Sequence, residues 1–199
     1  MWLTINAVFS DLRLSDFLYY FSEEGGPIKP DVSLMKKTKC HECGQYHDWD
    51  KIEVIFKFPD TYFDIPEDER NERVKANREI CVIDEEHYLR GVLPVPVSLK
   101  QKTFYRWGVW VKVDLKTFRV IYDNWEVEDQ SHLKGLKGKL ANEIRFYEKT
   151  LNKALRIQPI SNKVRPHFYF SHDRRLMEIQ DTTMKERDLM DIYHYHFEK

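Results

Sequence analysis

The feature that most constrains the fold is a run of β-type segments in the middle of the chain. Hydrophobic, β-branched and aromatic residues fill four segments with short polar connections between them: 80–84, 88–97, 103–113 and 118–127. Such a composition is typical of strands. Strands joined by short connections usually pair with their sequence neighbours, and residues 114–117 suit a hairpin turn between the last two. The sequence therefore predicts a central antiparallel meander.

Helical patterns flank this meander. Apolar residues recur at steps of three and four over residues 139–157, which is the spacing of one helix face. They are Leu140, Ile144, Tyr147, Leu151 and Leu155. A capping-box pattern, with Thr183 three residues before Glu186, predicts a last helix. Asp64 followed by Pro66 predicts the start of a charged surface helix that runs through Arg78.

The expected fold class is α+β, with a central antiparallel β-sheet packed by helices and a cysteine knuckle near the N-terminus. Glycine and proline at residues 25–27 end an apolar N-terminal segment. We therefore expect an N-terminal arm over residues 1–33 and a single domain over residues 34–199.

Composition excludes several classes of protein. The formal net charge is −1 at pH 7, so no global charge attracts nucleic acid or an anionic membrane. No run approaches the ~18 apolar residues of a spanning helix, and residues 1–9 lack the basic region of a signal peptide. Three cysteines, an odd number, do not make a disulfide framework. We therefore expect a cytoplasmic location.

The stretch from Cys40 to His47 carries the strongest hint of a metal site. Two cysteines three positions apart, followed by Gly44, form half of a zinc ribbon, because the turn between them points both sulfurs at one ion. His47 is the candidate third ligand and Cys81 the candidate fourth. The hypothesis is a structural zinc site; the alternative is a thiol turn whose cysteines pack as small apolar groups, with Cys81 in the core.

Two basic features carry hypotheses of their own. Arg90 and Gly91 interrupt an apolar strand, which favours a buried salt bridge from Arg90 to Asp84 or Asp114, or a close backbone approach at the glycine. Residues 134–156 hold seven basic and two acidic residues, which could suit phosphate contact. Acidic residues between positions 123 and 129 could neutralise them, so the sequence favours a solvated helix face and indicates no clear nucleic-acid partner.

Several short motifs together resemble one bacterial family. They follow one another in this order: Cys40-x-x-Cys43-Gly44-x-x-His47, Pro59-x-x-Tyr62, Ile65-Pro66, Ile80-Cys81-Val82-Ile83-Asp84, Leu89-Arg90-Gly91-Val92-Leu93-Pro94-Val95-Pro96-Val97, Trp107-Gly108-Val109-Trp110-Val111, Arg165-Pro166 and His172. The combination resembles the "domain of unknown function" family 2199 over roughly residues 36–180. The resemblance implies a bacterial protein and no particular activity.

No nucleophile elbow and no phosphate-binding loop stands in the sequence. The leading hypothesis is a non-enzymatic binding or interaction module with a protein partner, whose zinc knuckle stabilises a loop. The alternative is a metal-dependent hydrolase that uses the cysteine and histidine cluster with an open coordination position. A closed site with four ligands would favour the first, and a three-ligand site in a cleft would favour the second.

Overall fold

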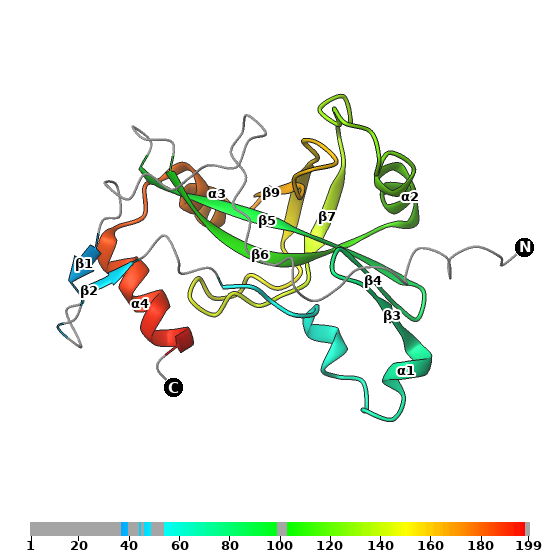
Figure 1. Ribbon diagram of the computed structural model, residues 1–199, viewed down its shortest axis with the longest axis horizontal. Helices are drawn as coiled ribbons and strands as arrows, with labels where there is room; N and C mark the ends of the chain where they lie inside the picture. The colour runs from blue at the N-terminus through cyan, green and yellow to red at the C-terminus, as the bar shows by residue number, and fades with distance from the viewer. Residues whose placement is uncertain (1–36, 40–43, 45, 49–53, 99–102, 198–199) are drawn as a thin grey trace, which may run out of the picture. The chain divides into compact units, whose positions relative to one another are not determined.

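The central strands of the computed structural model close into a barrel. The structure describes residues 37–39, 44, 46–48, 54–98 and 103–197, all within the unit Met35–Lys199. Five consecutive strands pair antiparallel: β5 (Glu86–Ser98), β6 (Thr103–Val113), β7 (Lys137–Leu140), β8 (Ala154–Gln158) and β9 (His167–Phe170). β9 then pairs in parallel with β5 at Val92 and His167, and this closes the ring (Figure 1). With an odd number of strands in a meander, the first and last must run in the same direction.

Further strands lie outside the ring. β4 (Ile80–Ile83) pairs with the first residues of β5, and β3 (Val74–Ala76) pairs with β4. β1 (Lys37–Lys39) and β2 (Tyr46–Asp48) form a separate antiparallel pair. The predicted meander is thus confirmed for the segments 80–84, 88–97 and 103–113, and so is the α+β class.

Alternating side chains fill the barrel. Because successive residues of a strand point to opposite faces, every second residue of β6 lies in the main core. The buried core residues from the five strands include Leu89, Leu93, Trp107, Val109, Val111, Leu140, Leu155, Ile157, Phe168 and Phe170. These residues come from segments far apart in sequence, so the core depends on closure of the ring.

A second, smaller core lies on the outer face of β4, β5 and β6. Its buried members are Ile65, Cys81, Ile83, Tyr88, Trp110 and Ala141. The segment around residues 54–56 runs alongside β6, where Gly108 exchanges backbone hydrogen bonds with Val54 and Phe56 at 3.0 and 2.9 Å. The Trp110 indole donates to the Phe56 carbonyl at 3.1 Å. Both faces of β6 are therefore buried.

Gly91 permits the ring to close. The Val92 amide donates to the Pro166 carbonyl at 3.0 Å, which brings the chain before β9 against β5. A Cβ at Gly91 would lie 2.3 Å from the Phe168 ring and 2.5 Å from the Pro166 carbonyl oxygen. The expectation of a close backbone approach at Gly91 is confirmed.

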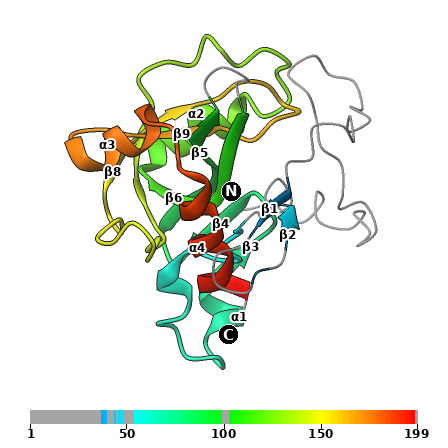
Figure 2. The same ribbon diagram turned by 90° about the vertical axis from the view of Figure 1, so that its left-hand side faces the viewer.

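Among the described residues, three helices of eight residues or more pack beside the barrel. α2 (Leu115–Asp123) begins after Asp114, α3 (Arg174–Asp181) begins after Asp173, and α4 (Glu186–Phe197) ends the described chain. The Asp114 carboxylate accepts from the Thr117 amide at 2.7 Å, which caps α2. α2 lies at one side of Figure 1 and α3 and α4 at the other, so α3 and α4 are in front in Figure 2.

Two sequence predictions about this region are wrong. Residues 118–127 were expected as a strand, but Asp114 caps a helix in place of the hairpin turn, and the apolar side of α2 is buried at Ile121. The helix expected from Asp64 through Arg78 is reduced to α1 (Arg70–Arg73), after a 3-10 turn (Asp60–Tyr62). β3 follows α1 at once because residues 74–76 pair with β4.

The helix expected over residues 139–157 is absent, and β7, an irregular loop and β8 occupy this stretch. Glu148, Lys149 and Asn152 have positive φ angles of 56°, 51° and 61°, which no right-handed helix allows. The apolar pattern still identified core positions, since Leu140, Ile144, Tyr147 and Leu155 are buried. Spacing alone could not separate a helix face from a strand–loop–strand unit that buries the same residues.

A buried polar network holds this loop. Asn142 is fully buried: its Oδ1 accepts from the Trp110 amide at 2.8 Å, and its Nδ2 donates to the Phe58 carbonyl and to Asp60 Oδ1, both at 2.9 Å. The Glu143 amide donates to Asp60 Oδ2 at 2.7 Å. Asn142 therefore ties β6, the segment around residue 58 and the loop together, and each of its polar atoms is bonded.

The N-terminal predictions lie largely outside the described residues. Cys40 and Cys43 are not described, so the cysteine knuckle stays a prediction, and so does the boundary between an arm 1–33 and a domain 34–199. Within the described residues, no helix is both long and apolar enough to span a bilayer.

Candidate functional site

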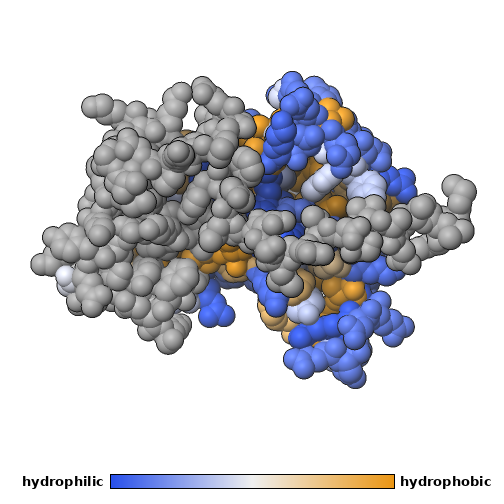
Figure 3. Space-filling view, in the orientation of Figure 1, coloured by the Kyte–Doolittle hydropathy of each residue, from blue (hydrophilic) through white to orange (hydrophobic). Residues whose placement is uncertain are grey.

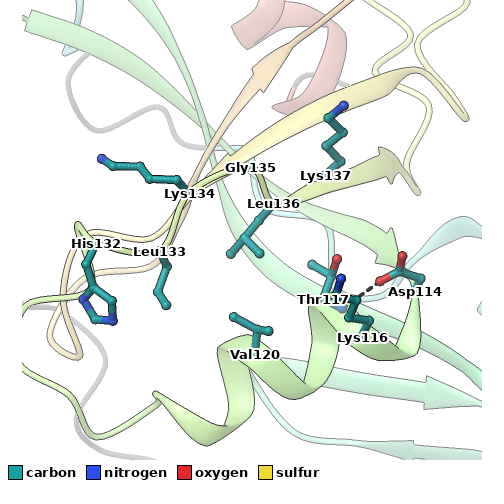
Figure 4. Close-up of a pocket in the computed structure, with 10 residues that line it drawn as sticks. All are labelled: Asp114, Lys116, Thr117, Val120, His132, Leu133, Lys134, Gly135, Leu136 and Lys137. Carbon is teal, nitrogen blue, oxygen red and sulfur yellow. Dashed lines mark hydrogen bonds between the residues drawn. The ribbon is translucent and has the colours of Figure 1, made fainter.

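A pocket of about 440 Å³ opens between α2 and the segment that leads into β7 (Figure 4). It is lined by Asp114, Lys116, Thr117, Val120, His132, Leu133, Lys134, Gly135, Leu136 and Lys137. Val120, Leu133 and Leu136 point toward one another across the space, while Lys134 and Lys137 extend away from them (Figure 4). The pocket thus has an apolar floor and a basic rim.

Local sequence sets both walls. On one side, the cap at Asp114 starts α2 and places Lys116 in its first turn. On the other, the buried Gln130 side chain donates to the Asn124 and Trp125 carbonyls at 2.8 and 3.2 Å, and this fixes the segment that follows α2. Gly135 has a φ of 72°, a conformation that favours glycine, and the chain turns there into β7.

Basic side chains predominate among the charged residues that line the pocket. Three lysines and one histidine line it, against a single carboxylate among the ten lining residues, that of Asp114. Hydrogen bonds from Thr117 hold the pKa of Asp114 below its usual value, so this carboxylate stays charged and serves as the cap of α2. Within the described part of the chain, none of the three lysines is in an ion pair shorter than 4 Å.

The basic character continues onto the outer face of the barrel. Lys137 on β7 stands directly opposite Arg156 on β8, and the Arg156 guanidinium lies 4.9 Å from the ring centre of Tyr169 on β9. Lys139 is exposed on β7 opposite Ala154. In the space-filling view, hydrophilic residues dominate the surface around α2 and the loop after it (Figure 3). Like charges that face each other across strands cost stability.

The residues predicted to bind metal are only partly described. Cys40 and Cys43 lie outside the described residues, and His47 is known only as a member of β2, opposite Thr38. The described residues contain no group of three potential ligands that could hold a metal ion. The ligand set Cys40, Cys43, His47 and Cys81 therefore stays a prediction.

Cys81 is fully buried in the second core, among residues such as Ile83 and Trp110. Burial raises the pKa of its thiol to about 12, because a thiolate would lose its hydration there. These surroundings suit the alternative interpretation of Cys81 as a core residue. A zinc ion that used Cys81 would have to offset this cost by binding the thiolate directly.

The salt bridge expected at Arg90 is absent from the described contacts. Asp84 pairs with Arg73 at 2.9 Å, and Asp114 caps α2. The register explains the error: Asp84 follows the end of β4 that lies opposite Glu86, whereas Arg90 lies beyond the other end, where Ile80 faces Leu89. Arg90 donates instead to the Arg78 carbonyl at 3.2 Å.

The basic residues between Lys134 and Arg156 are close in sequence but do not share one helix face, because this segment is not a helix. Lys134 and Lys137 line the pocket, while Lys153 pairs with Asp173 at 2.7 Å. Sequence reasoning missed Lys116 and His132, which join the pocket only through the fold. The Asp114–Thr117 spacing is a helix-cap signal that could have placed Lys116 at a helix start.

The fold and the pocket define a small α+β protein with a five-stranded barrel and a basic surface site. Comparison of the sequence with known families gives a match over residues 39–182 to the family described as "Uncharacterized protein conserved in bacteria (DUF2199)". The chain belongs to this family, and the resemblance drawn from its motifs is confirmed. No curated protein and no solved structure matches the chain.

Proposed function

We propose that this protein is a binding module that holds an acidic segment of a protein partner in the pocket beside α2. One observation supports this most strongly: four basic side chains surround a pocket whose one carboxylate is used as a helix cap. The Asp129 carboxylate, near His132 and Lys134, offsets part of this charge. The positive excess that remains attracts acidic partners and raises their association rate.

The lining favours binding over catalysis. Its polar groups are mainly cationic, and the His132 ring already lies 3.0 Å from the Asp129 carbonyl. The apolar floor formed by Val120, Leu133 and Leu136 would suit an apolar side chain within the acidic segment. A peptide that combines both kinds of residue could therefore contact the floor and the rim together.

The rim lysines are expected to control binding of an acidic peptide. The probe is a fluorescein-labelled peptide of glutamates with a central leucine, and the measurement is fluorescence anisotropy at low salt. The triple variant Lys116→Glu, Lys134→Glu and Lys137→Glu should weaken binding at least about 10-fold, or ~1.4 kcal/mol. All three side chains are exposed, so the thermal unfolding midpoint should change little.

A control with the same net charge tests whether the site is local. Lys57, Lys149 and Lys185 are exposed and lie outside the pocket lining. Their triple replacement by glutamate should change the peptide Kd by less than about twofold, since distant surface charges are screened. Equal weakening by the two triple variants would show that net charge, and not this pocket, governs binding.

We also propose that a structural zinc ion stabilises the N-terminal knuckle. β1 and β2 pair with Lys39 opposite Tyr46, and Cys40 and Cys43 lie between these two strands in the sequence. Gly44 in that connection has a φ of 71°, as expected of a tight turn after two ligands. The pairing of β1 with β2 supports the knuckle, and His47 and Cys81 complete the proposed ligand set.

Metal analysis of protein prepared without chelators should find about one zinc ion per chain. The double variant Cys40→Ser and Cys43→Ser should lose it, because each serine removes a thiolate ligand. Retention of zinc in Cys81→Ala would assign Cys81 to the core and leave three ligands, as the hydrolase alternative requires. Wild-type protein without zinc would end the knuckle proposal, whatever the variants show.

A further inference from the structure

β5 is forked at Arg90 and Gly91. On one edge of this strand, β4 pairs with residues up to Leu89, and β9 begins to pair at Val92. The Arg90 amide still donates to the Glu79 carbonyl at 2.8 Å, and the Val92 amide donates to the Pro166 carbonyl at 3.0 Å. Two neighbouring strands therefore diverge from β5 within three residues.

An ion pair spans this fork. Arg165, just before β9, donates to both carboxylate oxygens of Glu79, just before β4, at 2.7 and 2.5 Å. The two side chains are 37% and 27% exposed, so the pair is partly shielded from water. The bidentate geometry engages both oxygens of Glu79 and aligns this carboxylate with Arg165.

Arg90 stands beside this pair. Its guanidinium lies 5.7 Å from the ring centre of Trp110, and that ring is itself fixed by the bond from its indole to Phe56. Burial first, and then the nearby charges of Arg165 and Arg78, lower the pKa of Arg90, while the Glu79 carboxylate opposes this shift. The guanidinium is half-buried and donates one hydrogen bond, to Arg78, among the described residues.

The remaining Arg90 donors are open to water. Buried side-chain nitrogens without a bond partner do not occur among the described residues, so the unbonded nitrogens of Arg90 are accessible. Arg78 and Arg165 bring further positive charges near Arg90, and Glu79, the partner of Arg165, brings a negative one. The cation–π contact with Trp110 restrains the Arg90 guanidinium, which lowers the entropy cost of binding an anion.

We propose that the fork is a second binding site, in which Arg90, with the charges of Arg78 and Arg165, binds one oxyanion group: a carboxylate or a phosphate. The site is separate from the pocket beside α2 and does not depend on the function proposed for that pocket. Both ligand groups present paired oxygens to a planar guanidinium, and this shared chemistry is what the fork recognises.

The test is an NMR titration of the arginine Nε–H signals in the full chain. Inorganic phosphate is the probe in one arm and acetate in the other, and the Arg90 signal is assigned by its loss in Arg90→Lys. The Arg90 signal should shift and saturate with a Kd of about 1 mM in at least one arm. The arm that saturates at lower concentration identifies the ligand group.

An exposed arginine supplies the internal control. Arg119 on α2 should shift linearly, without saturation, in the same spectra. If Arg90 shifts no more than Arg119 in both arms, the proposal is overturned. The pocket variant with three glutamates should leave the Arg90 titration unchanged; a joint loss in that variant would also overturn a separate site.

Discussion

Gly91→Ala should destabilise the protein by about 3 kcal/mol, the upper part of the range for overpacking in a core. The new Cβ would meet the Phe168 ring at 2.3 Å and the Pro166 carbonyl oxygen at 2.5 Å. The carbonyl cannot move away without breaking its bond to the Val92 amide, and that bond holds the closure of the barrel. At this size of chain, the thermal midpoint should fall by about 6–12 °C, as measured by circular dichroism.

Gly108→Ala is the matched control on the neighbouring strand. Its Cβ would meet the Ile55 side chain at 3.1 Å, and Ile55 is 52% exposed and can shift. We expect a loss below about 1 kcal/mol, near the effect of an ordinary surface change. If the two glycine variants lose equal stability, close approach at the fork is not what makes Gly91 necessary.

Asn142→Ala should have an effect of about 3–5 kcal/mol. It leaves the Trp110 amide and the Phe58 carbonyl without their bonds and removes one donor to Asp60. Each buried group left unpaired costs about 1–3 kcal/mol. Denaturant unfolding of the purified variant measures the loss.

Asn162→Ala serves as the control for Asn142→Ala. The exposed Asn162 side chain makes a single bond, to the Glu126 carbonyl, so its loss should cost less than about 1 kcal/mol.

Asn142→Asp keeps the shape of the side chain but replaces its hydrogen-bond donor by an acceptor. At neutral pH the new carboxylate would face Asp60 and the Phe58 carbonyl, so its folded pKa should be raised above the unfolded value of about 3.9. A group with a raised folded pKa loses its stabilising contribution as the pH rises through that pKa. Relative to wild type, Asn142→Asp should therefore gain stability on acidification from neutral pH, and a pH-independent difference would argue against the network.

Sequence patterns predicted local structure correctly where the residues of a segment favour the same structure that the tertiary fold gives them. Strands β4 to β6 were recognisable because they are rich in β-branched and aromatic residues, which favour strands. The 139–157 segment failed because Leu140, Ile144, Tyr147 and Leu155 are buried at helical spacing by a strand, a loop and a strand. Asn142, at the centre of this segment, gave no signal, since its partners lie more than 30 positions away.

The candidate sites depended even more on long-range contacts. Lys116 and Lys137 line one pocket although 20 residues separate them. Gly91 was the one sequence sign that β9 closes on β5. The sequence indicated a close backbone approach at this glycine but not that Pro166 and Phe168 are the residues that approach it. Arg90 drew attention as an arginine in an apolar strand, but the register that takes it away from Asp84 exists only in the folded chain.

Because the number of strands in the barrel is odd, the segments that follow β6 and β9 leave from different ends of β5. β6 ends beside the start of β5, where Val113 faces His87, and α2 follows there. β9 runs with β5, so the helix after it reaches the later half of β5, where Gln180 donates to the Pro94 carbonyl at 3.0 Å. The pocket beside α2 and helix α3 therefore lie toward opposite ends of β5. Contacts made at one end need not involve residues at the other.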